Sequence, residues 1–368
     1  MRVPFVDLYA QYKTMKPEMD RAITEVINKS AYIRGEYVEG FEKKFAKAYG
    51  MKHCISLGNG TDAIYITLKM LGMGRGSEVI TAANTWISTS ETVTQTGARV
   101  VFADEEADYF TIDPKDVERK ITKRTKAIIP VHLYGQAADM KNLKRIAKEY
   151  KLTLIEDCAQ AHFAEYHGKL VGKFGKVATF SFYPGKNLGA YGDAGAVLTD
   201  DDNLAEKVRM YANHGSLVKH EHLMEGVNSR MDGIQAAVLS VKLKKVKSWN
   251  RARSRWAEYY NKLLADVDEV AMPKVRNSSR HVFHVYAIRA EDRDRLQMFL
   301  RSKGIETAIH YPTPLPFLRA YKYLGHKGDD FPVARQYQDK ILSLPMFAEL
   351  TPRQIEYVVE MIKKFYGR

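Results

Sequence analysis

The sequence has few cysteines and no long apolar run. Its 368 residues contain two cysteines, Cys54 and Cys158, which stand far apart inside apolar runs. Two such residues cannot form a disulfide framework, and the pattern is typical of reduced, buried thiols in a cytosolic protein. No apolar run approaches the ~20 residues that a membrane-spanning helix needs. We therefore expect a cytoplasmic protein without a membrane partner.

Targeting, repeat and nucleic-acid-binding signals are also missing. The first residues, MRVPFVDLYAQY, match neither a signal peptide nor a transit peptide. The formal net charge of +13 favours anionic partners, whether nucleic acid, a membrane surface or a phosphorylated small molecule. No repeat, zinc-ligand spacing or RNA-binding motif occurs, so we expect neither a metal site nor a nucleic-acid partner. Basic residues are densest from Lys242 to Arg255, where a helical pattern predicts a solvated face.

Apolar runs and helical patterns alternate along most of the chain. Strand-like runs of β-branched and aromatic residues lie at 54–57, 78–81, 99–102, 126–135, 151–157 and 177–183. Their alternation with helical patterns predicts an α/β protein with a mostly parallel sheet that is covered on both faces. A long helical pattern, 234–264, leads to a smaller α+β unit, with strands near 282–288 and before Pro312. The predicted domains are residues 1–245 and 246–368.

Residues 53–71 predict a strand, a glycine turn and a helix. The turn reads Gly58-Asn59-Gly60-Thr61, and the apolar residues that follow fall at helical spacing. Free amides at such a helix start bind anions, and glycines let a phosphate approach the backbone. The Thr61 hydroxyl can add a further donor. The segment also fits the GxGxxA dinucleotide fingerprint, and a plain tight turn is a third possibility.

Lys186 lies between two predicted strands, 177–183 and 196–198. Pro184 and Gly185 end the first strand with turn chemistry. The residues after the lysine are small and flexible: Gly189, Ala190, Gly192, Ala194 and Gly195. Little side-chain bulk therefore surrounds Lys186, which suits a lysine that contacts a ligand. Taken alone, a lysine after Pro-Gly is more often a surface turn residue.

Two further candidates stand at the ends of predicted strands. Asp157 closes the strand 151–157, and Gln160 lies three residues on. Ligands of parallel sheets bind beyond the carboxyl ends of the strands, so Asp157 is either a helix cap or a partner for a buried cation. Trp86 follows another strand, where its indole could lie flat on a heteroaromatic ring, although a tryptophan is more often a core residue.

Pyridoxal phosphate requires all four features together. Its aldehyde needs a lysine for a Schiff base, its pyridine nitrogen needs an acidic partner, its phosphate needs amides and hydroxyls, and its ring needs a stacking face. A nicotinamide enzyme would account for the glycines but not for Asp157 or Lys186. The residues therefore favour a pyridoxal phosphate enzyme.

The strings DCAQAH and FSFYPGKNLGAYGDAGA resemble motifs of the DegT/DnrJ/EryC1/StrS family of sugar aminotransferases. GNGTDA upstream, with GVNSRMDGIQAA and HYP downstream, extends the resemblance over nearly the whole chain. It implies fold type I of the pyridoxal phosphate enzymes, the aspartate aminotransferase-like fold, in which the large domain, 1–245, binds the cofactor. Members of the family are typically homodimers with shared active sites.

By this resemblance, Lys186 would hold the cofactor covalently and later move a proton between substrate and cofactor. Asp157 would pair with the pyridinium nitrogen, Gln160 would bond to the ring hydroxyl, and Trp86 would stack on the ring. The implied phosphate contacts are Gly60, Thr61, Ser181 and Asn228 of the partner subunit.

The substrate contacts that the family implies are Tyr183, His310 and Tyr311. The basic loop from Lys219 to His222 could meet the diphosphate of a nucleotide sugar, with a solvated loop as an equal alternative. His162 is either a further substrate contact or a polar core residue.

Three residues depart from the family pattern. Phe163 stands where a glycine is usual, Ala194 replaces the first glycine of GDGGA, and Pro316 replaces a frequent histidine. Phe163 and Pro316 are expected near the substrate end, so they bear on the identity of the sugar. The strings HLYGQ and GDAGA favour members that act on 3-keto sugars over those that act on 4-keto sugars.

The implied reaction moves an amino group from L-glutamate to a nucleotide-linked keto-sugar, a dTDP- or UDP-linked 3-keto hexose. The product would be an amino sugar for a surface polysaccharide, such as the O-antigen of lipopolysaccharide, or for a secondary metabolite. Alternatives are a 4-keto nucleotide-sugar or ketocyclitol aminotransferase and, in a different class, a cofactor-binding regulator without turnover. Lys186 argues against related dehydratases, which carry histidine at this position.

Overall fold

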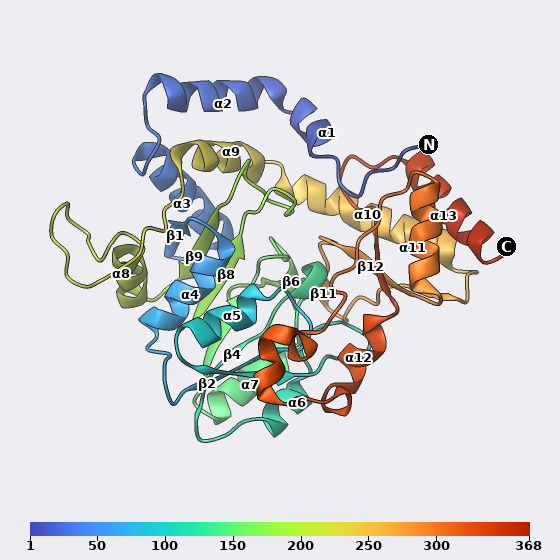
Figure 1. The fold of residues 1–368 in the computed structure, drawn as a ribbon. Helices are drawn as coiled ribbons and strands as arrows, with labels where there is room; N and C mark the ends of the chain where they lie inside the picture. Colours follow the sequence, from blue (N-terminus) through green and yellow to red (C-terminus); the bar gives the residue numbers. More distant parts are fainter.

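The computed structural model describes residues 1–368, and a seven-stranded sheet forms its centre (Figure 1). The strands are β1 (His53–Leu57), β2 (Glu78–Ala82), β3 (Arg99–Ala103), β4 (Thr125–Ile129), β5 (Thr153–Asp157), β8 (Val177–Ser181) and β9 (Gly195–Thr199). They lie in the order β1-β9-β8-β5-β4-β2-β3. β9 runs antiparallel to β1 and β8, and the other pairs are parallel. The predicted α/β class with a mostly parallel, mixed sheet is confirmed.

Both faces of this sheet are buried under helices. Successive residues of a strand point to opposite faces, so they belong to different cores. In β5, Leu154 belongs to one core and Ile155 to the other. The first core is covered by helices α2 (Lys16–Asn28), α3 (Glu36–Tyr49), α6 (Pro114–Arg119), α7 (Met140–Glu149) and α9 (Gly233–Leu243). The second core is covered by α4 (Gly60–Met70), α5 (Ser88–Gln95) and α8 (Asp202–Tyr211). The large sheet is thus sandwiched between two helix layers.

The C-terminal part of the chain has its own core. Its antiparallel sheet consists of β10 (Val270–Ala271), β12 (Tyr286–Ala290) and β13 (Ile341–Leu344). At the right of Figure 1, this sheet is packed by α10 (Val246–Leu264), α11 (Arg293–Ser302) and α13 (Pro352–Phe365). None of the helices combines the length and the apolar character that crossing a membrane requires.

Several segments cross the predicted boundary at residue 245. Val3 pairs with Ile305 and belongs to the C-terminal core. In the opposite direction, the core under α4, α5 and α8 includes Leu315, Tyr321, Phe331 and Ala334. A third small sheet joins the two parts through β6 (Glu165–Tyr166), β7 (Lys169–Leu170) and β11 (Ser279–Arg280). The two parts are therefore linked by more than the α9–α10 connection.

Two predicted elements differ from the structure. The helical pattern 234–264 forms two helices, α9 and α10, which a turn separates without any glycine or proline to mark the break. The strand predicted before Pro312 is absent, and Ala308 makes only a single bridge to Ser343. In both places the local pattern is uninterrupted, and the packing of distant segments decides the outcome.

The basic run from Lys242 to Arg255 was predicted as a solvated face, and this is wrong for two of its residues. Lys242 is buried and its Nζ donates to the carbonyl O of Gly189 at 2.7 Å. Arg253 is buried as well, and its Nη1 donates to backbone carbonyls, with the carbonyl O of Met346 at 2.7 Å. Backbone carbonyls replace the water that these cations lose.

Glu156, on β5, is fully buried, yet both of its carboxylate oxygens are hydrogen-bonded. Oε1 accepts from the amides of Phe174 (2.6 Å) and Gly175 (2.7 Å). Oε2 accepts from the amide of Gly172 (2.7 Å) and from Nε2 of His132 (3.0 Å). Three of these bonds hold the segment from Gly172 to Gly175 against β5, and the fourth ties His132 to the same carboxylate.

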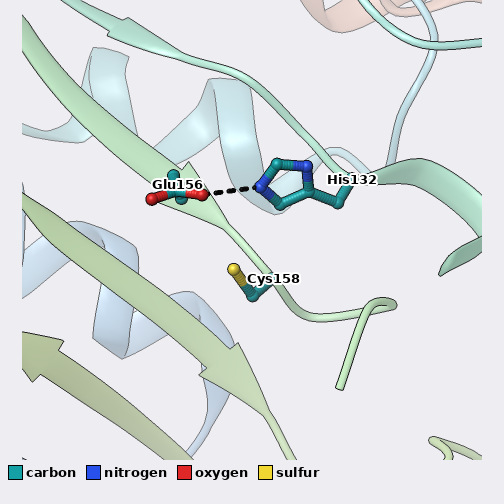
Figure 2. Close-up of side chains that lie close together, drawn as sticks. All are labelled: His132, Glu156 and Cys158. Atoms are coloured by element: carbon teal, nitrogen blue, oxygen red, sulfur yellow. Dashed lines mark hydrogen bonds and ion pairs between the residues drawn. The ribbon is translucent and has the colours of Figure 1, made fainter. Parts of the chain in front are cut away.

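Cys158 lies beside Glu156 and His132, and the three side chains together resemble a set of metal ligands (Figure 2). However, the amide of Ala138 donates to Nδ1 of His132 at 3.1 Å, which places the ring proton on Nε2, facing Glu156. Both ring nitrogens and both carboxylate oxygens are therefore engaged. The cluster is a structural cross-link, and a cation would have to break it in order to bind.

Glu105 is buried without any hydrogen-bond partner at either carboxylate oxygen. Oδ1 of Asn84 is also buried and unpaired. Burial raises the pKa of Glu105 well above its ordinary value, and the neighbouring charge of Asp104 raises it further. Burial therefore favours the protonated, neutral form of this side chain, although the nearby Asn84 opposes the shift.

Glu156→Gln should destabilise the fold, because the amide NH2 of glutamine would face backbone N–H groups that now donate to a carboxylate. Leaving buried donors unpaired costs about 3 kcal/mol. We expect a lower thermal midpoint for the cofactor-free variant in calorimetry. Glu258→Gln, on the exposed face of α10, is the control and should not change the midpoint. An unchanged midpoint for Glu156→Gln would show that the cross-link is dispensable.

Glu105→Gln should stabilise the protein, but only at high pH. The folded-state pKa of Glu105 lies above the ordinary value of 4.5, so the unfolded chain loses this proton first as the pH rises. The wild type is therefore progressively destabilised above that value, whereas the glutamine variant cannot ionise. Thermal midpoints should coincide near about pH 4 and be higher for the variant at about pH 8. Equal midpoints at the higher pH would refute a neutral Glu105.

Candidate functional site

Several of the predicted site residues stand at one edge of the large sheet. Asp157 is the last residue of β5, and Ser181 is the last residue of β8. Gly60 opens α4 beside Ser181: a Cβ atom on Gly60 would lie 2.6 Å from the Cβ atom of Ser181. A Cβ atom on Gly195 would lie 2.2 Å from the carbonyl O of Asn59. Only glycine lets the start of α4 approach β8 and β9 this closely.

The start of α4 forms a cup of hydrogen-bond donors. Asn59 caps the helix with its side chain, whereas the amides of Gly60 and Thr61 precede the first intrahelical bonds and stay free. Oγ1 of Thr61 lies 2.7 Å from Oγ of Ser88, the first residue of α5. With the hydroxyl of Ser181, two amides and three hydroxyls meet here, a donor set that fits a phosphate group.

Asp157 is buried next to this cup. Oδ2 accepts from Oγ1 of Thr89 (2.9 Å), and Oδ1 accepts from the amide of Ala159 (3.0 Å). No helix begins here, so the helix-cap alternative does not apply. Burial raises the pKa of Asp157 above its ordinary value, although these two hydrogen bonds and the charge of Lys186 oppose the shift. A protonated ring nitrogen is the kind of cation that would stabilise this carboxylate.

Gln160 and Trp86 are joined through Tyr311. Oε1 of Gln160 accepts from the amide of Tyr134 (2.7 Å), and Nε2 donates to the hydroxyl of Tyr311 (3.0 Å). The rings of Trp86 and Tyr311 lie 5.7 Å apart at 45°. Because Trp86 is 58% exposed, it is not a core residue, and its indole face is open to a ligand ring.

Lys186 is half-buried in the turn that follows β8. Burial lowers its pKa to about 8, although the charge of Asp157 opposes the shift. Lys242 of α9 packs against this turn, and its ammonium donates to the carbonyl O of Gly189 at 2.7 Å. A Cβ atom on Gly189 would lie 2.3 Å from the carbonyl O of Pro184. These contacts constrain the backbone of the turn. With a pKa of about 8, a fraction of the Lys186 amine is neutral at physiological pH.

The predicted sugar contacts have different surroundings. Tyr183 is 60% exposed. Nδ1 of His310 lies 2.8 Å from Oγ of Ser343, and the ring stacks on Phe5 with 5.7 Å between centroids. Burial and the charge of Lys186 lower the pKa of His310 to about 4. His310 is therefore a neutral side chain, and it adjoins the Tyr311 ring that bonds to Gln160.

His162 does not reach the surface of the protein. Its ring is fully buried, with centroids 5.6 and 5.5 Å from those of Phe180 and Phe182. Burial lowers its pKa to about 3. This placement matches the polar-core alternative and not a substrate contact. Phe163 is also a core residue, 4.8 Å from Tyr49, rather than part of the substrate end, and its φ of 63° explains why glycine is usual there.

Lys219 and Asn228 belong to the loop between α8 and α9, which extends away from the body at the left of Figure 1. Both side chains are exposed. Ser229 anchors the loop at the start of α4, since its Oγ accepts from the amide of Gly58 (3.1 Å) and donates to Asp62 (2.7 Å). The contacts of Lys219 and of the partner's Asn228 with a bound ligand stay predictions.

Sequence reasoning missed three residues of the site. Ser88 and Thr89 follow Trp86 and Ile87 in the stretch STSET, and consecutive hydroxyls so close to a candidate stacking residue were a usable signal. Lys242 falls at helical spacing from Val238 on the buried face of α9. A lysine within an apolar stripe signals a buried cation with a specific partner.

Known proteins resemble this chain over its full length. The model of the DegT/DnrJ/EryC1/StrS aminotransferase family matches residues 13–363. A "Pleiotropic regulatory protein" of Geobacillus stearothermophilus is 48% identical over 100% of this chain and 99% of its own length. The "dTDP-3-amino-3,4,6-trideoxy-alpha-D-glucose transaminase" of Streptomyces venezuelae is 41% identical over 100% of this chain and 97% of its own length.

Solved structures share the fold. S. venezuelae DesV in complex with a ketimine intermediate has a TM-score of 0.97 at 41% identity, covering 100% of this chain and 99% of its own. NtdA from Bacillus subtilis, with bound cofactor PMP, has a TM-score of 0.92 at 31% identity, covering 100% and 86%. The predicted fold and the predicted cofactor, pyridoxal phosphate, are confirmed. This chain belongs to the DegT/DnrJ/EryC1/StrS aminotransferase family.

Proposed function

We propose that this protein transfers an amino group from L-glutamate to a nucleotide-linked 3-keto hexose. The observation that carries the proposal is Lys186, a half-buried lysine with a pKa of about 8 beside the buried Asp157 and the free amides of α4. Support for the sugar comes from the 41% identical relative, which is named as a dTDP-3-amino-sugar transaminase.

Residues of this chain can hold each part of the cofactor. The amides of Gly60 and Thr61, with the neighbouring hydroxyls, fit the phosphate. Trp86 can cover one face of the ring, Gln160 can bond to the ring hydroxyl, and Asp157 can accept from the protonated ring nitrogen. When bound, the cofactor supplies an aldehyde that takes up an amino group and a ring that draws electrons from the reacting carbon.

Lys186 moves the proton in this proposal. Because burial lowers its pKa to about 8, Nζ is available as a neutral amine near neutral pH and can take a proton from the substrate carbon and return it. A lysine with an ordinary pKa would stay an ammonium and could not act as a base. Asp157 is shielded from water, which strengthens its interaction with a ring cation.

The remaining proposed contacts are those with the substrate and those made by the partner subunit. Tyr183, His310 and Tyr311 would contact the sugar. In a homodimer, the partner's Lys219 would meet the diphosphate and the partner's Asn228 would complete the phosphate site; the exposure of this loop supports both roles. The division into domains 1–245 and 246–368, a cytoplasmic location and a product for surface polysaccharide or a secondary metabolite belong to the same proposal.

A cofactor-binding regulator without turnover is the second candidate. It is favoured by the name of the 48% identical relative, a pleiotropic regulatory protein. A regulator would bind the cofactor but would not exchange its amino group with glutamate. The two candidates therefore differ in the first half-reaction, before any sugar is needed.

A panel of ketones tests the proposed function. The holoenzyme is treated with L-glutamate, desalted, and offered dTDP- and UDP-linked 3-keto hexoses, their 4-keto counterparts and a ketocyclitol, while the aldehyde absorbance is followed. We expect the absorbance to return with a 3-keto nucleotide sugar. Return with only a 4-keto sugar or a ketocyclitol would reject the 3-keto assignment. No response to glutamate would favour the regulator.

Asp157→Asn should slow both half-reactions by about 100-fold or more, because a neutral amide cannot keep the ring nitrogen protonated. Stopped-flow absorbance with glutamate measures the first half-reaction. Asp329→Asn, an exposed residue of the 3-10 helix η4 (Gly328–Asp330), is the matched control and should react normally. Near-normal rates for Asp157→Asn would leave Asp157 with a structural role only.

A further inference from the structure

A pocket of about 1060 Å³ lies beside the large sheet, between α7 and the hairpin of β6 and β7. Its floor includes residues 152–154 at the start of β5 and the segment 174–176. Thr153 is the first residue of β5, whereas Asp157, the proposed partner of the ring nitrogen, is the last. The pocket therefore lies at the opposite end of this strand from the cofactor site, and no predicted site residue lines it.

The lining of this pocket is strongly cationic. Six of its 15 residues are lysine or arginine, and none is aspartate or glutamate. Two of these cations are neutralised from outside the pocket: Arg145 pairs with Glu118 (2.8 Å), and Lys176 pairs with Asp201 (3.0 Å). The other four are exposed and form no ion pair: Lys141, Lys144, Lys148 and Lys169. The pocket thus gathers four cations that have no acidic partner.

These lysines come from two walls of the pocket. Lys144 and Lys148 are one helical turn apart on α7, where like charges repel each other. Lys169 belongs to β7, and its Nζ lies 4.8 Å from the centre of the Phe174 ring. Burial lowers the pKa of Lys169 below its ordinary value, and the charge of Lys144 lowers it further, whereas Glu156 opposes the shift. A bound anion would relieve this repulsion.

The floor of the pocket is apolar and held by hydrogen bonds within the chain. Phe174 is half-buried, and its ring lies 5.8 Å from that of Tyr166, at 74°. The amide of Phe174 donates to Oε1 of Glu156 (2.6 Å), and the hydroxyl of Tyr166 donates to Oδ1 of Asp139 (2.8 Å). Small-molecule sites typically combine such a preformed apolar floor with a few charged groups.

The shape of the pocket narrows the choice of anion. Small-molecule sites enclose about 300–1000 Å³, and this cavity is close to the upper end of that range. A membrane surface or a nucleic-acid duplex would instead need cations spread over a broad face. Lysine ammonium groups bind phosphate as point charges, and an aromatic floor suits a flat base. The lining thus fits a ligand that joins phosphates to a heteroaromatic base.

We propose that this pocket binds a nucleoside diphosphate group, with its phosphates among the four unpaired lysines and its base on the apolar floor. Free nucleotides and nucleotide-linked sugars both carry this group. The pocket is separate from the place where the cofactor and the reacting sugar would bind, so this inference does not rest on the proposed function. Failure of amino transfer would leave it standing.

Lys144→Glu combined with Lys148→Glu tests the α7 wall, with calorimetric titration of the holoenzyme by ADP as the measurement. Reversing two charges should weaken ADP binding by about 10-fold or more. Lys43→Glu with Lys47→Glu is the matched control, because both residues are exposed and lie one turn apart on α3. In each pair the second lysine stands in the last turn of its helix.

The control pair changes the net charge by the same amount and should leave the ADP affinity unaltered. An equal loss in both pairs would show a general effect of charge, and no loss in either pair would place ADP elsewhere. Both results would overturn the proposal. Lys169→Ala tests the opposite wall without touching α7 and should weaken ADP binding about threefold. An unchanged affinity in this variant would contradict a site that joins both walls.

The choice of probe tests the chemistry of the ligand. Inorganic pyrophosphate should bind about 10-fold more weakly than ADP, because it leaves the apolar floor uncovered. Equal affinities would overturn the nucleoside assignment. UDP and UDP-glucose are compared by the part of their binding that the α7 double variant abolishes. Weaker binding of UDP-glucose assigns the site to free nucleotides, and binding as tight as that of UDP assigns it to nucleotide-linked sugars; both support the diphosphate group.

Photolabelling gives the location directly. The holoenzyme is irradiated with 8-azido-ADP, digested and mapped by mass spectrometry. Label is expected in the segments 140–154 and 166–176, which line the pocket. Label confined to the peptide that contains Trp86 would place the nucleotide beside the cofactor and contradict the proposal.

Discussion

The whole arrangement depends on one constraint: the amine of Lys186 must lie where burial weakens the hydration of its charge. Burial brings its pKa to about 8, and the nearby carboxylate of Asp157 limits the shift. Parallel pairing of β5 with β8 places the acid and the lysine turn at the same edge of the sheet. The start of α4 joins them only because Gly60 has no side chain, and it brings the positive end of a helix dipole to the place where a phosphate would bind.

The protonation states of the imidazoles near Lys186 depend on the same burial. Burial lowers the pKa of His162 to about 3 and that of His310 to about 4, and the charge of Lys186 acts in the same direction on both. His284 is also held well below its ordinary value. Neutral rings can accept hydrogen bonds without adding positive charge beside the amine. The protonation states that matter are therefore those of Lys186 and its acidic neighbour.

The sheet and the cofactor side of the site were predictable because their signals are local. Strand and helix patterns alternate; Asp157 ends one strand and Lys186 lies in the turn after another, and a short stretch of sequence reveals each strand. The remaining features depend on distant partners. Nothing beside His162 distinguishes a core histidine from a ligand contact, and the role of Lys242 depends on a carbonyl 53 positions away. His284 likewise meets a residue far away in the sequence, since its Nδ1 lies 3.2 Å from Oδ1 of Asn187 in the lysine turn.

Lys186 is not the only lysine whose pKa is lowered by burial, because the pKa of the fully buried Lys242 is also lowered to about 8. A low pKa therefore does not decide which amine bonds to the cofactor; the position beside Asp157 and the start of α4 does. Lys242 is already committed to the carbonyl O of Gly189. The most direct test is borohydride reduction of the cofactor-loaded protein, followed by peptide mapping. A single adduct on Lys186 is predicted, and an adduct on Lys242, or on no lysine, would contradict the account.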